Sequence, residues 1–382
     1  MLDVAVVGGG PVGTYLGCLL AQAGLSFAVL ERRTQPLQHS RAIGIHPRAL
    51  HGFSRLGLGD AVQAAGVTIR RGLLLGEGSR VLGELSFRAA DPRFPYILSL
   101  PQVQTEQLLN GRLDALAPGA LRRSVTVRQL KDCGSHLTLT LETASGQLEQ
   151  LSARQVVAAD GWRSALREAA DLDFPGGLYA DRYLMGDFPD TTPFGQDAVI
   201  SLTQGGVTEC FPLPGGLRRW VVHTGCDLLT DAEPAALTDI IRERTGLPVP
   251  ASECRMLSAF TVRRHLAPRM HLGRLSLIGD AAHVVSPIGG QGMNLGWLDA
   301  ETLAPLLTRA ARGEQVAPAE WRRWEQTRRR SAWMAARQAE ANMSAGRPVT
   351  AAQQQAREAL LTGLLGPRTA PLLASAFTMR WL

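Results

Sequence analysis

Three glycines and a later glutamate have the types and spacing that bind a dinucleotide. Gly8, Gly10 and Gly13 follow the apolar run at residues 2–7, and Glu31 ends the next apolar run. In this pattern the first glycine permits a tight turn, the second lets the backbone approach a pyrophosphate, and the third lets a helix pack closely on a strand. A carboxylate placed like that of Glu31 can accept hydrogen bonds from an adenosine ribose. We expect an adenine dinucleotide here; the alternative is a glycine-rich turn with only a structural use.

A second acidic residue, Asp280, closes a strand-like run and could hold sugar hydroxyls. It follows Gly279 at the end of the run 275–278. The alternative is a helix cap, because aspartate is favoured at that position. Another Asp-Gly pair, Asp160 and Gly161, follows a different apolar run. Alone, this pair is typical of an ordinary turn, and we expect Asp160 to orient backbone rather than to touch a substrate.

A glycine-rich segment could bind negative charge at the start of a helix. Gly289, Gly290 and Gly292 precede a helix expected from Met293 to Leu307. The free N–H groups at a helix start attract an anion, such as a reduced ring system. Pro287 would stiffen the turn beside that ring.

The elements that must position these residues follow from apolar spacing. The pattern predicts a helix from Val12 to Ala23, with Pro11 near its first position, and a strand from Phe27 to Leu30. A second long helix is expected from Ala319 to Asn342, and its Arg328-Arg329-Arg330 run favours a solvated helix face.

Together the three motifs resemble those of the FAD-dependent aromatic hydroxylases, the class A flavoprotein monooxygenases of the p-hydroxybenzoate hydroxylase type. The resemblance implies FAD as cofactor, with Asp280 on its ribityl chain. It also implies that Arg41 runs along the flavin and that Gln102, with Gln104 as a possible substitute, reaches the ribityl region. The full set expected to bind the cofactor is Gly8, Gly10, Pro11, Val12, Gly13, Glu31, Arg32, Arg41, Gln102, Val125, Asp160, Asp280, Pro287, Gly290, Gly292, Met293 and Asn294.

The resemblance also implies a reaction. NADPH or NADH would reduce FAD, and a flavin C4a-hydroperoxide would hydroxylate a phenolic, polyketide-like or indole-derived aromatic compound. The protein must supply a dry pocket for this chemistry. Two alternatives stay open: an FAD-dependent reductase of prenyl or carotenoid double bonds, and a non-catalytic FAD-binding protein.

Four residues are candidates for the catalytic step itself. His46, Tyr183 and His223 could draw a proton from a phenol, and Pro287 would lie beside the flavin. For the two histidines and the tyrosine, a structural role in the core or the sheet is the stronger alternative, because no motif surrounds them.

Composition excludes several other classes. The 382 residues carry a net charge of only +6 with no long block of like charges, so we expect no nucleic-acid partner. Five scattered cysteines and no paired helical histidines predict no metal site. No apolar run reaches the roughly 20 residues of a spanning helix, and because the sequence opens on a strand-like run we expect no signal peptide. We expect a cytoplasmic monomer or homodimer without stable membrane insertion.

The expected fold class is α/β: a Rossmann-like FAD-binding domain, a discontinuous β-sheet substrate domain and a C-terminal helical segment. Strand-like runs interrupted by Gly-Gly turns mark the sheet insertions. The expected boundaries are 1–70, 98–172 and 268–345 for the FAD-binding domain, 71–97 and 173–267 for the sheet domain, and 346–382 for the C-terminal helical segment.

Overall fold

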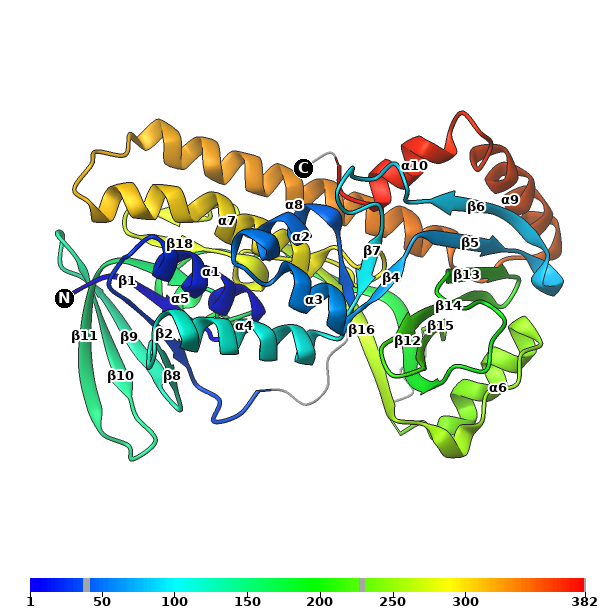
Figure 1. Ribbon diagram of the computed structural model, residues 1–382, viewed down its shortest axis with the longest axis horizontal. Coiled ribbons are helices and arrows are strands. Elements are labelled where there is room, and N and C mark those ends of the chain that lie inside the picture. Colours follow the sequence, from blue (N-terminus) through cyan, green and yellow to red (C-terminus); the bar gives the residue numbers. More distant parts are fainter. Residues whose placement is uncertain (37–41, 227–230, 381–382) are drawn as a thin grey trace.

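A mostly parallel sheet carries the dinucleotide pattern. The computed structural model describes residues 1–36, 42–226 and 231–380, and Figure 1 shows this sheet at the left. Its main path runs β17-β18-β11-β1-β2-β8, and β10 and β9 extend it from β11. These strands are β1 (Leu2–Val7), β2 (Phe27–Glu31), β8 (Leu121–Arg123), β9 (Thr126–Asp132), β10 (Leu137–Glu142), β11 (Leu148–Ala158), β17 (His271–Leu272) and β18 (Leu275–Leu277).

Burial explains the central position of β1. Val4, Ala5 and Val6 are fully buried, and β1 pairs in parallel with both β2 and β11. A continuous apolar run is typical of a parallel strand that is covered on both faces. The carboxyl ends of β1, β11 and β18 therefore lie side by side, which brings the three sequence motifs to one edge of the sheet.

Helices cover this sheet and begin close to the expected residues. α1 starts at Pro11 and α7 at Gly292, and α1 packs against both α4 and α7. Proline at the first helical position is favourable because its missing N–H would have no partner there. The helices are α1 (Pro11–Gln22), α2 (Pro47–Arg55), α3 (Gly59–Ala65), α4 (Gln102–Leu116), α5 (Ala165–Ala169), α7 (Gly292–Ala311) and α8 (Pro318–Ala345).

A second sheet of eight strands runs in the order β19-β16-β12-β15-β14-β13-β5-β6. One face packs on α6 (Pro234–Thr245), through Leu237 and Ile241 against Leu184 and Trp220. The strands are β5 (Arg71–Leu75), β6 (Val81–Ser86), β12 (Gly176–Pro189), β13 (Ala198–Thr203), β14 (Gly206–Leu213), β15 (Leu217–His223), β16 (Met256–Leu266) and β19 (His283–Val284).

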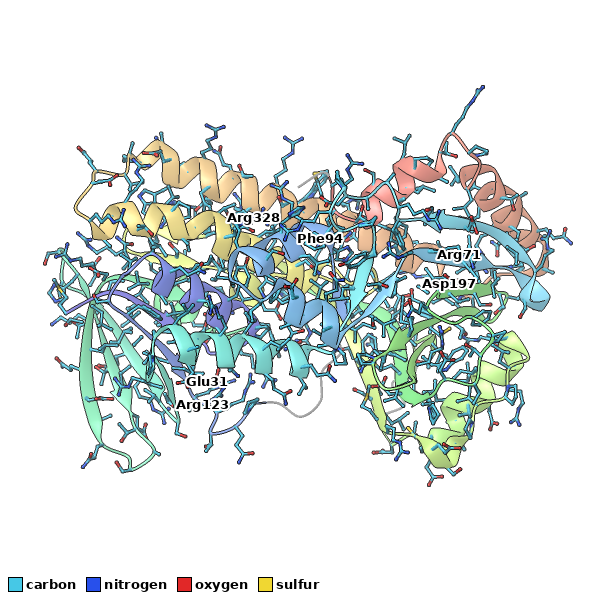
Figure 2. All side chains as sticks on the ribbon, in the orientation of Figure 1. Glu31, Arg71, Phe94, Arg123, Asp197 and Arg328 are labelled. Carbon is cyan, nitrogen blue, oxygen red and sulfur yellow. The ribbon has the colours of Figure 1, made fainter. Side chains whose placement is uncertain are left out.

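The hairpin β5–β6 joins this sheet from a distant part of the sequence. β5 pairs in parallel with β13 and antiparallel with β6. The side chains of Arg71 and Asp197, labelled in Figure 2, fasten the start of β5 to β13, with Arg71 Nη2 2.6 Å from Asp197 Oδ2. A small third sheet, β3 (Gly44–Ile45), β7 (Ile97–Ser99) and β4 (Val67–Ile69), connects the two large ones.

The chain ends in two helices over the β5–β6 hairpin. α9 (Ala351–Leu364) and α10 (Ala370–Phe377) both pack against β6 (Figure 1). The mixed α/β fold class is confirmed, whereas the domain boundaries stay a prediction. Within the described ranges, no helix is long and apolar enough to cross a membrane.

Candidate cofactor and substrate site

One large cavity extends from the end of the first sheet to the second sheet. Its volume is about 1180 Å³, above the roughly 300–1,000 Å³ of a site for one drug-sized ligand. Gly10 and Glu31 line it at one end, and Phe211 and Phe260 of the second sheet and Phe377 of α10 line it at the other. The space suits a cofactor and a second ligand together.

The first motif shapes one end of this cavity through contacts of its glycines. A Cβ on Gly8, whose φ is +109°, would lie 2.2 Å from the carbonyl oxygen of Ala159. A Cβ on Gly13 would lie 1.9 Å from the carbonyl oxygen of Gly8, whereas Gly10 has nothing within 4 Å. Gly8 and Gly13 therefore permit close packing, and Gly10 leaves open backbone that a ligand can approach.

Glu31 is held by backbone at the same end. Its Oε2 accepts a hydrogen bond from the N–H of Gly9 and its Oε1 from the N–H of Arg33, both at 2.8 Å. The side chain lines the cavity beside Arg32 and Val125. Each carboxylate oxygen can accept a second hydrogen bond, so Glu31 can still bind a ribose.

The second and third motifs lie directly against the first. Asp280, in the single-turn helix η3 (Gly279–Ala281), lines the cavity, and the surrounding protein raises the pKa of its carboxyl. A Cβ on Gly279 would approach Val12 Cγ2 to 3.2 Å, and a Cβ on Gly296 would approach it to 2.4 Å. These two glycines let α1, η3 and α7 meet beside the cavity.

A buried network of charged side chains holds Gly279, the residue before Asp280, on the side away from the cavity. Asp299 Oδ2 accepts from the N–H of Gly279 at 3.0 Å and lies 2.6 Å from His283 Nε2, while Oδ1 accepts from Arg328 Nε at 2.7 Å. Burial raises the pKa of Asp299, but His283 and Arg328 outweigh it and hold the pKa below its usual value. The expectation that Arg328 is part of a solvated face was wrong, because its side chain is buried in this network. The sequence did not indicate this ion pair, because Asp299 and Arg328 belong to different helices.

The glycine-rich turn is tied to the small sheet by Asn294. Its Oδ1 accepts from the N–H of His46 at 2.9 Å, and its Nδ2 donates to the carbonyls of Gly44 and Gly290. Asn294 thus fixes the turn and does not line the cavity, whereas Pro287, Gly290, Gly292 and Met293 do line it.

His46 is the one histidine among the described lining residues. Burial lowers the pKa of its imidazole to about 4, so it is neutral at pH 7 and a weak proton acceptor. Gln102, the first residue of α4, also lines the cavity, and its Nε2 donates to Glu106 Oε1 at 2.7 Å.

Asp160 has a free polar atom at the cavity wall. Its Oδ2 accepts from the N–H of Leu166 at 3.4 Å, while its buried Oδ1 has no hydrogen-bond partner. Burial raises the pKa of this carboxyl. The contact with Leu166 supports α5, and Oδ1 is a buried acceptor at the cavity wall.

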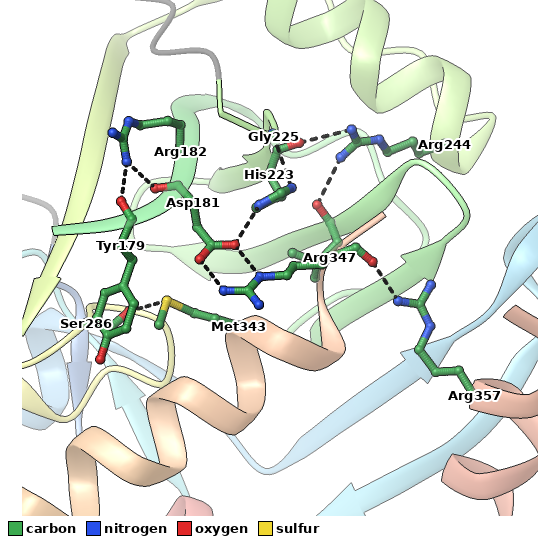
Figure 3. A network of polar contacts seen from close by, with 11 residues as sticks. Tyr179, Asp181, Arg182, His223, Gly225, Arg244, Ser286, Met343, Arg347 and Arg357 are labelled. Atoms are coloured by element: carbon green, nitrogen blue, oxygen red, sulfur yellow. Dashed lines mark hydrogen bonds and ion pairs between the residues drawn. The ribbon is translucent and has the colours of Figure 1, made fainter. Parts of the chain in front are cut away.

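Tyr183 and His223 lie together away from the cavity lining. Figure 3 shows the Asp181 carboxylate between His223 and Arg347. His223 Nε2 is 3.1 Å from Asp181 Oδ1, and Arg347 donates to both oxygens at 2.8 Å. Tyr183 stacks on Phe260 at 5.4 Å. The Asp181–Arg347 pair fastens the segment after α8 to the second sheet, and both candidates pack within that sheet, which favours the structural alternative for them.

Most of the residues expected to bind the cofactor line this cavity, but their roles stay predictions. Gly13 and Asn294 pack behind the lining, and Arg41 lies outside the described residues. The residues that do line it are Gly8, Gly10, Pro11, Val12, Glu31, Arg32, Gln102, Val125, Asp160, Asp280, Pro287, Gly290, Gly292 and Met293.

The other wall of the cavity is one face of the second sheet. Alternate residues of β13, β14, β15 and β16 line it, as the two-residue period of a strand requires. Among these mostly apolar side chains is Glu209, a buried carboxyl that sequence reasoning missed. The alternation of Val207, Glu209 and Phe211 was the available signal. The lining set is Met185, Ala198, Ile200, Leu202, Val207, Glu209, Phe211, Arg219, Val221, Met256, Ser258 and Phe260.

Comparison with known proteins decides the family. A family described as FAD binding domain matches residues 1–339. The chain belongs to the FAD-dependent aromatic hydroxylases. The expectations of this family and of FAD as its cofactor are thereby confirmed.

Two curated relatives are from Streptomyces. A 12-dehydrotetracycline 5-monooxygenase/anhydrotetracycline 6-monooxygenase from Streptomyces rimosus is 33% identical over 79% of this chain and 61% of its own length. A rifampicin monooxygenase from Streptomyces venezuelae is 34% identical over 79% of this chain and 63% of its own length. The chain therefore spans about three fifths of these relatives.

Solved structures show the same fold. An anhydrotetracycline hydroxylase from Streptomyces rimosus has a TM-score of 0.81 and 30% identity, covering 99% of this chain and 75% of that one. A p-nitrophenol 4-monooxygenase from Pseudomonas putida has a TM-score of 0.90 over 98% of this chain and 97% of that one. At 24% identity, the latter likeness concerns the fold alone.

The residues of this chain fit FAD. The open backbone at Gly10 suits a pyrophosphate, and the free Oδ1 of Asp160 and the cavity-facing Asp280 suit polar groups of a cofactor. The N–H groups at the start of α7 lie beside Gly290 and Pro287, where an electron-rich ring would find positive dipoles.

Proposed function

We propose that this protein is an FAD-dependent monooxygenase that hydroxylates an aromatic small molecule with NADPH or NADH and O2. The observation that carries the proposal is the continuous cavity, which joins the dinucleotide motifs to an apolar sheet face. Bound FAD would supply hydride acceptance and oxygen activation. Overall, one oxygen atom of O2 enters the ring, the other becomes water, and NAD(P)H is oxidised.

The chain's own residues would hold, orient and shield the reactants. Glu31 and the backbone at Gly10 would bind the adenosine and pyrophosphate, and Asp280 would bind the ribityl hydroxyls. The start of α7 would stabilise negative charge on the reduced ring. Phe211 and Phe260 would pack against an aromatic substrate, and the sheet with α9 and α10 would exclude water.

The proposed substrate class follows from the cavity and from the relatives. The relatives' names include 12-dehydrotetracycline, anhydrotetracycline and rifampicin, which are large multi-ring compounds. A cavity of about 1180 Å³ with four lining phenylalanines suits a polyketide-like or other phenolic compound. We further propose the domain division given above, with 71–97 and 173–267 as the substrate domain, and a monomer or homodimer.

The deciding experiment uses purified protein loaded with FAD. It is incubated with NADPH or NADH and a panel of one-ring to four-ring aromatic compounds, while O2 uptake is recorded and products are analysed by mass spectrometry. We expect substrate-stimulated oxidation of the nicotinamide and a product heavier by one oxygen atom. Reduction of a prenyl or carotenoid double bond without O2 would indicate the reductase instead. No turnover with any compound would indicate a non-catalytic flavoprotein.

A further inference from the structure

The apolar wall of the cavity contains one acidic side chain with no protein partner. Glu209 is in the middle of β14 and is only 8% exposed, and it lines the cavity. Its neighbours across the ladder are Ile200 of β13 and Val221 of β15. Among the described residues, none forms a hydrogen bond or an ion pair with this carboxyl, and burial is the only cause that shifts its pKa.

A buried carboxyl without a hydrogen-bond partner lowers the stability of the fold unless a bound ligand supplies that partner. Leaving a buried polar group unsatisfied costs free energy, and a buried charge costs more. Burial alone raises the pKa of Glu209 to about 7. Near neutral pH this carboxyl can therefore either donate or accept a proton, as a general acid or base must.

Four further ionisable side chains share this sheet face with Glu209: Asp187 and Tyr183 on β12, and their ladder partners Arg219 and His223 on β15. His223 is held by Asp181, 3.1 Å from its Nε2. Arg219 is diagonal to it, two residues from Val221 in the register, but its Nε and Nη2 are held by Asp187 at 2.7 and 2.8 Å. Tyr183 of β12 is buried, and its hydroxyl has no hydrogen-bond partner. Its raised pKa, due first to burial and then to the charge of Glu209, keeps it neutral. Glu209 is thus the proton acceptor of this wall.

We propose that the Glu209 carboxyl recognises a phenolic hydroxyl of the substrate and accepts its proton. The O–H bond of the phenol breaks, its electron pair stays on the phenol oxygen, and a new O–H bond forms on the carboxylate. The resulting negative charge enriches the ring carbons in electrons, which favours transfer of an electrophilic oxygen atom to the ring. This role rests on the proposed monooxygenase reaction, whereas recognition of the hydroxyl can be measured without turnover.

The test compares a phenol with its parent arene. Binding of 2-naphthol and naphthalene to the FAD-loaded protein is titrated through the flavin absorbance, at pH 6 and pH 8. The variants are Glu209→Gln, Glu209→Leu and the control Glu84→Gln, which removes an exposed carboxylate on β6 of the same sheet. FAD content and melting temperature verify that each variant is folded.

We expect the wild type and Glu84→Gln to bind 2-naphthol about tenfold or more tightly than naphthalene, the gain from a hydrogen bond to a charged group. Glu209→Leu should lose this preference. Glu209→Gln should keep part of it, because its amide still forms a hydrogen bond, and this residual preference should be the same at pH 6 and pH 8, whereas that of the wild type should be larger at pH 8. In turnover, kcat/KM of the wild type should rise with pH through about 7, and Glu209→Gln should lack that rise.

An unchanged preference for naphthol in both Glu209 variants, or no preference in the wild type, would overturn the proposal. The two proposals fail separately. If no compound gains oxygen while the Glu209-dependent preference persists, the monooxygenase reaction is wrong and recognition stands. If products gain oxygen while both variants bind and react like the wild type, the reaction stands and the role of Glu209 is wrong.

Discussion

The pKa values of individual carboxyl groups in this protein differ because the groups around them differ. Asp299 is surrounded by donors and keeps its charge, whereas Glu209 is surrounded by apolar side chains and favours its neutral form near pH 7. Asp280 lies between these cases, at the cavity surface with an elevated pKa. The sequence indicated Asp280 through its glycine motif. It did not indicate Glu209, because an isolated glutamate in a strand usually faces solvent.

The role of Asp280 can be measured by cofactor affinity. We expect Asp280→Ala to weaken FAD binding by roughly 1.5–3 kcal/mol, about 10- to 100-fold in Kd, because a hydrogen bond to a charged group is lost. Titration of the apoprotein with FAD, followed by flavin fluorescence, gives the constant. Asp280→Asn is the control and should lose less, since its amide still makes hydrogen bonds. Equal affinity in all three proteins would mean that Asp280 only caps the turn.

Glu209 should also make the stability of the protein depend on pH. Its folded pKa of about 7 is above the ordinary 4.5, so the fold favours the neutral form. The resulting penalty is absent below about pH 4.5, grows as pH rises and is complete above about pH 7. We therefore expect Glu209→Gln to be more stable than the wild type at pH 8, by up to roughly 3 kcal/mol, and equally stable near pH 4.5. Urea unfolding at both pH values measures this difference, and a constant difference would contradict the assignment.

At the scale of elements, the sequence predicted the helices better than the sheet pairing. α1, α7 and α8 begin within a residue of their expected starts because proline and glycine mark them. The parallel pairing of β5 with β13 could not be predicted, since it depends on how distant segments meet and not on local pattern. The buried position of Arg328 could not be predicted for the same reason, because it depends on the contact between α7 and α8.

The contact between α7 and α8 can be tested through its ion pair. We expect Arg328→Met to lower the free energy of unfolding by about 3 kcal/mol or more, because Asp299 keeps a buried charge without its main cation. FAD affinity should fall as well, since Asp299 orients Gly279. Chemical denaturation measures the first effect. Arg330→Met, an exposed position on the same helix, is the control and should change stability by less than about 0.5 kcal/mol.

At the scale of the whole molecule, the cavity exists only because four parts of the chain meet. The first sheet, the second sheet, the small connecting sheet and the C-terminal helices all contribute lining side chains. Sequence motifs could place one end of the cavity, because their glycines and acidic residues form a pattern typical of dinucleotide binding. They could not place the substrate end, because apolar strands and helices carry no comparable signal.

The position of α10 at the cavity wall predicts how efficiently NADPH oxidation is coupled to hydroxylation. Leu373 of α10 lines the cavity, while its neighbour Leu372 is 70% exposed. We expect Leu373→Ser to admit water and raise the yield of hydrogen peroxide per NADPH oxidised, with a stability loss of about 1 kcal/mol. Leu372→Ser should match the wild type in both measurements. Peroxide yields that are equal in the two variants would show that α10 does not seal the site.

The pairing of β5 with β13 has a consequence for synthesis on the ribosome. The hairpin β5–β6 emerges about 120 residues before β13, its partner in the second sheet. At roughly 5–20 residues per second, the open edge of β5 waits about 6–24 s for that partner. During this interval the nascent chain presents an unpaired strand to other chains. The pairing that closes the second sheet therefore exposes this strand edge to aggregation while the chain is being translated.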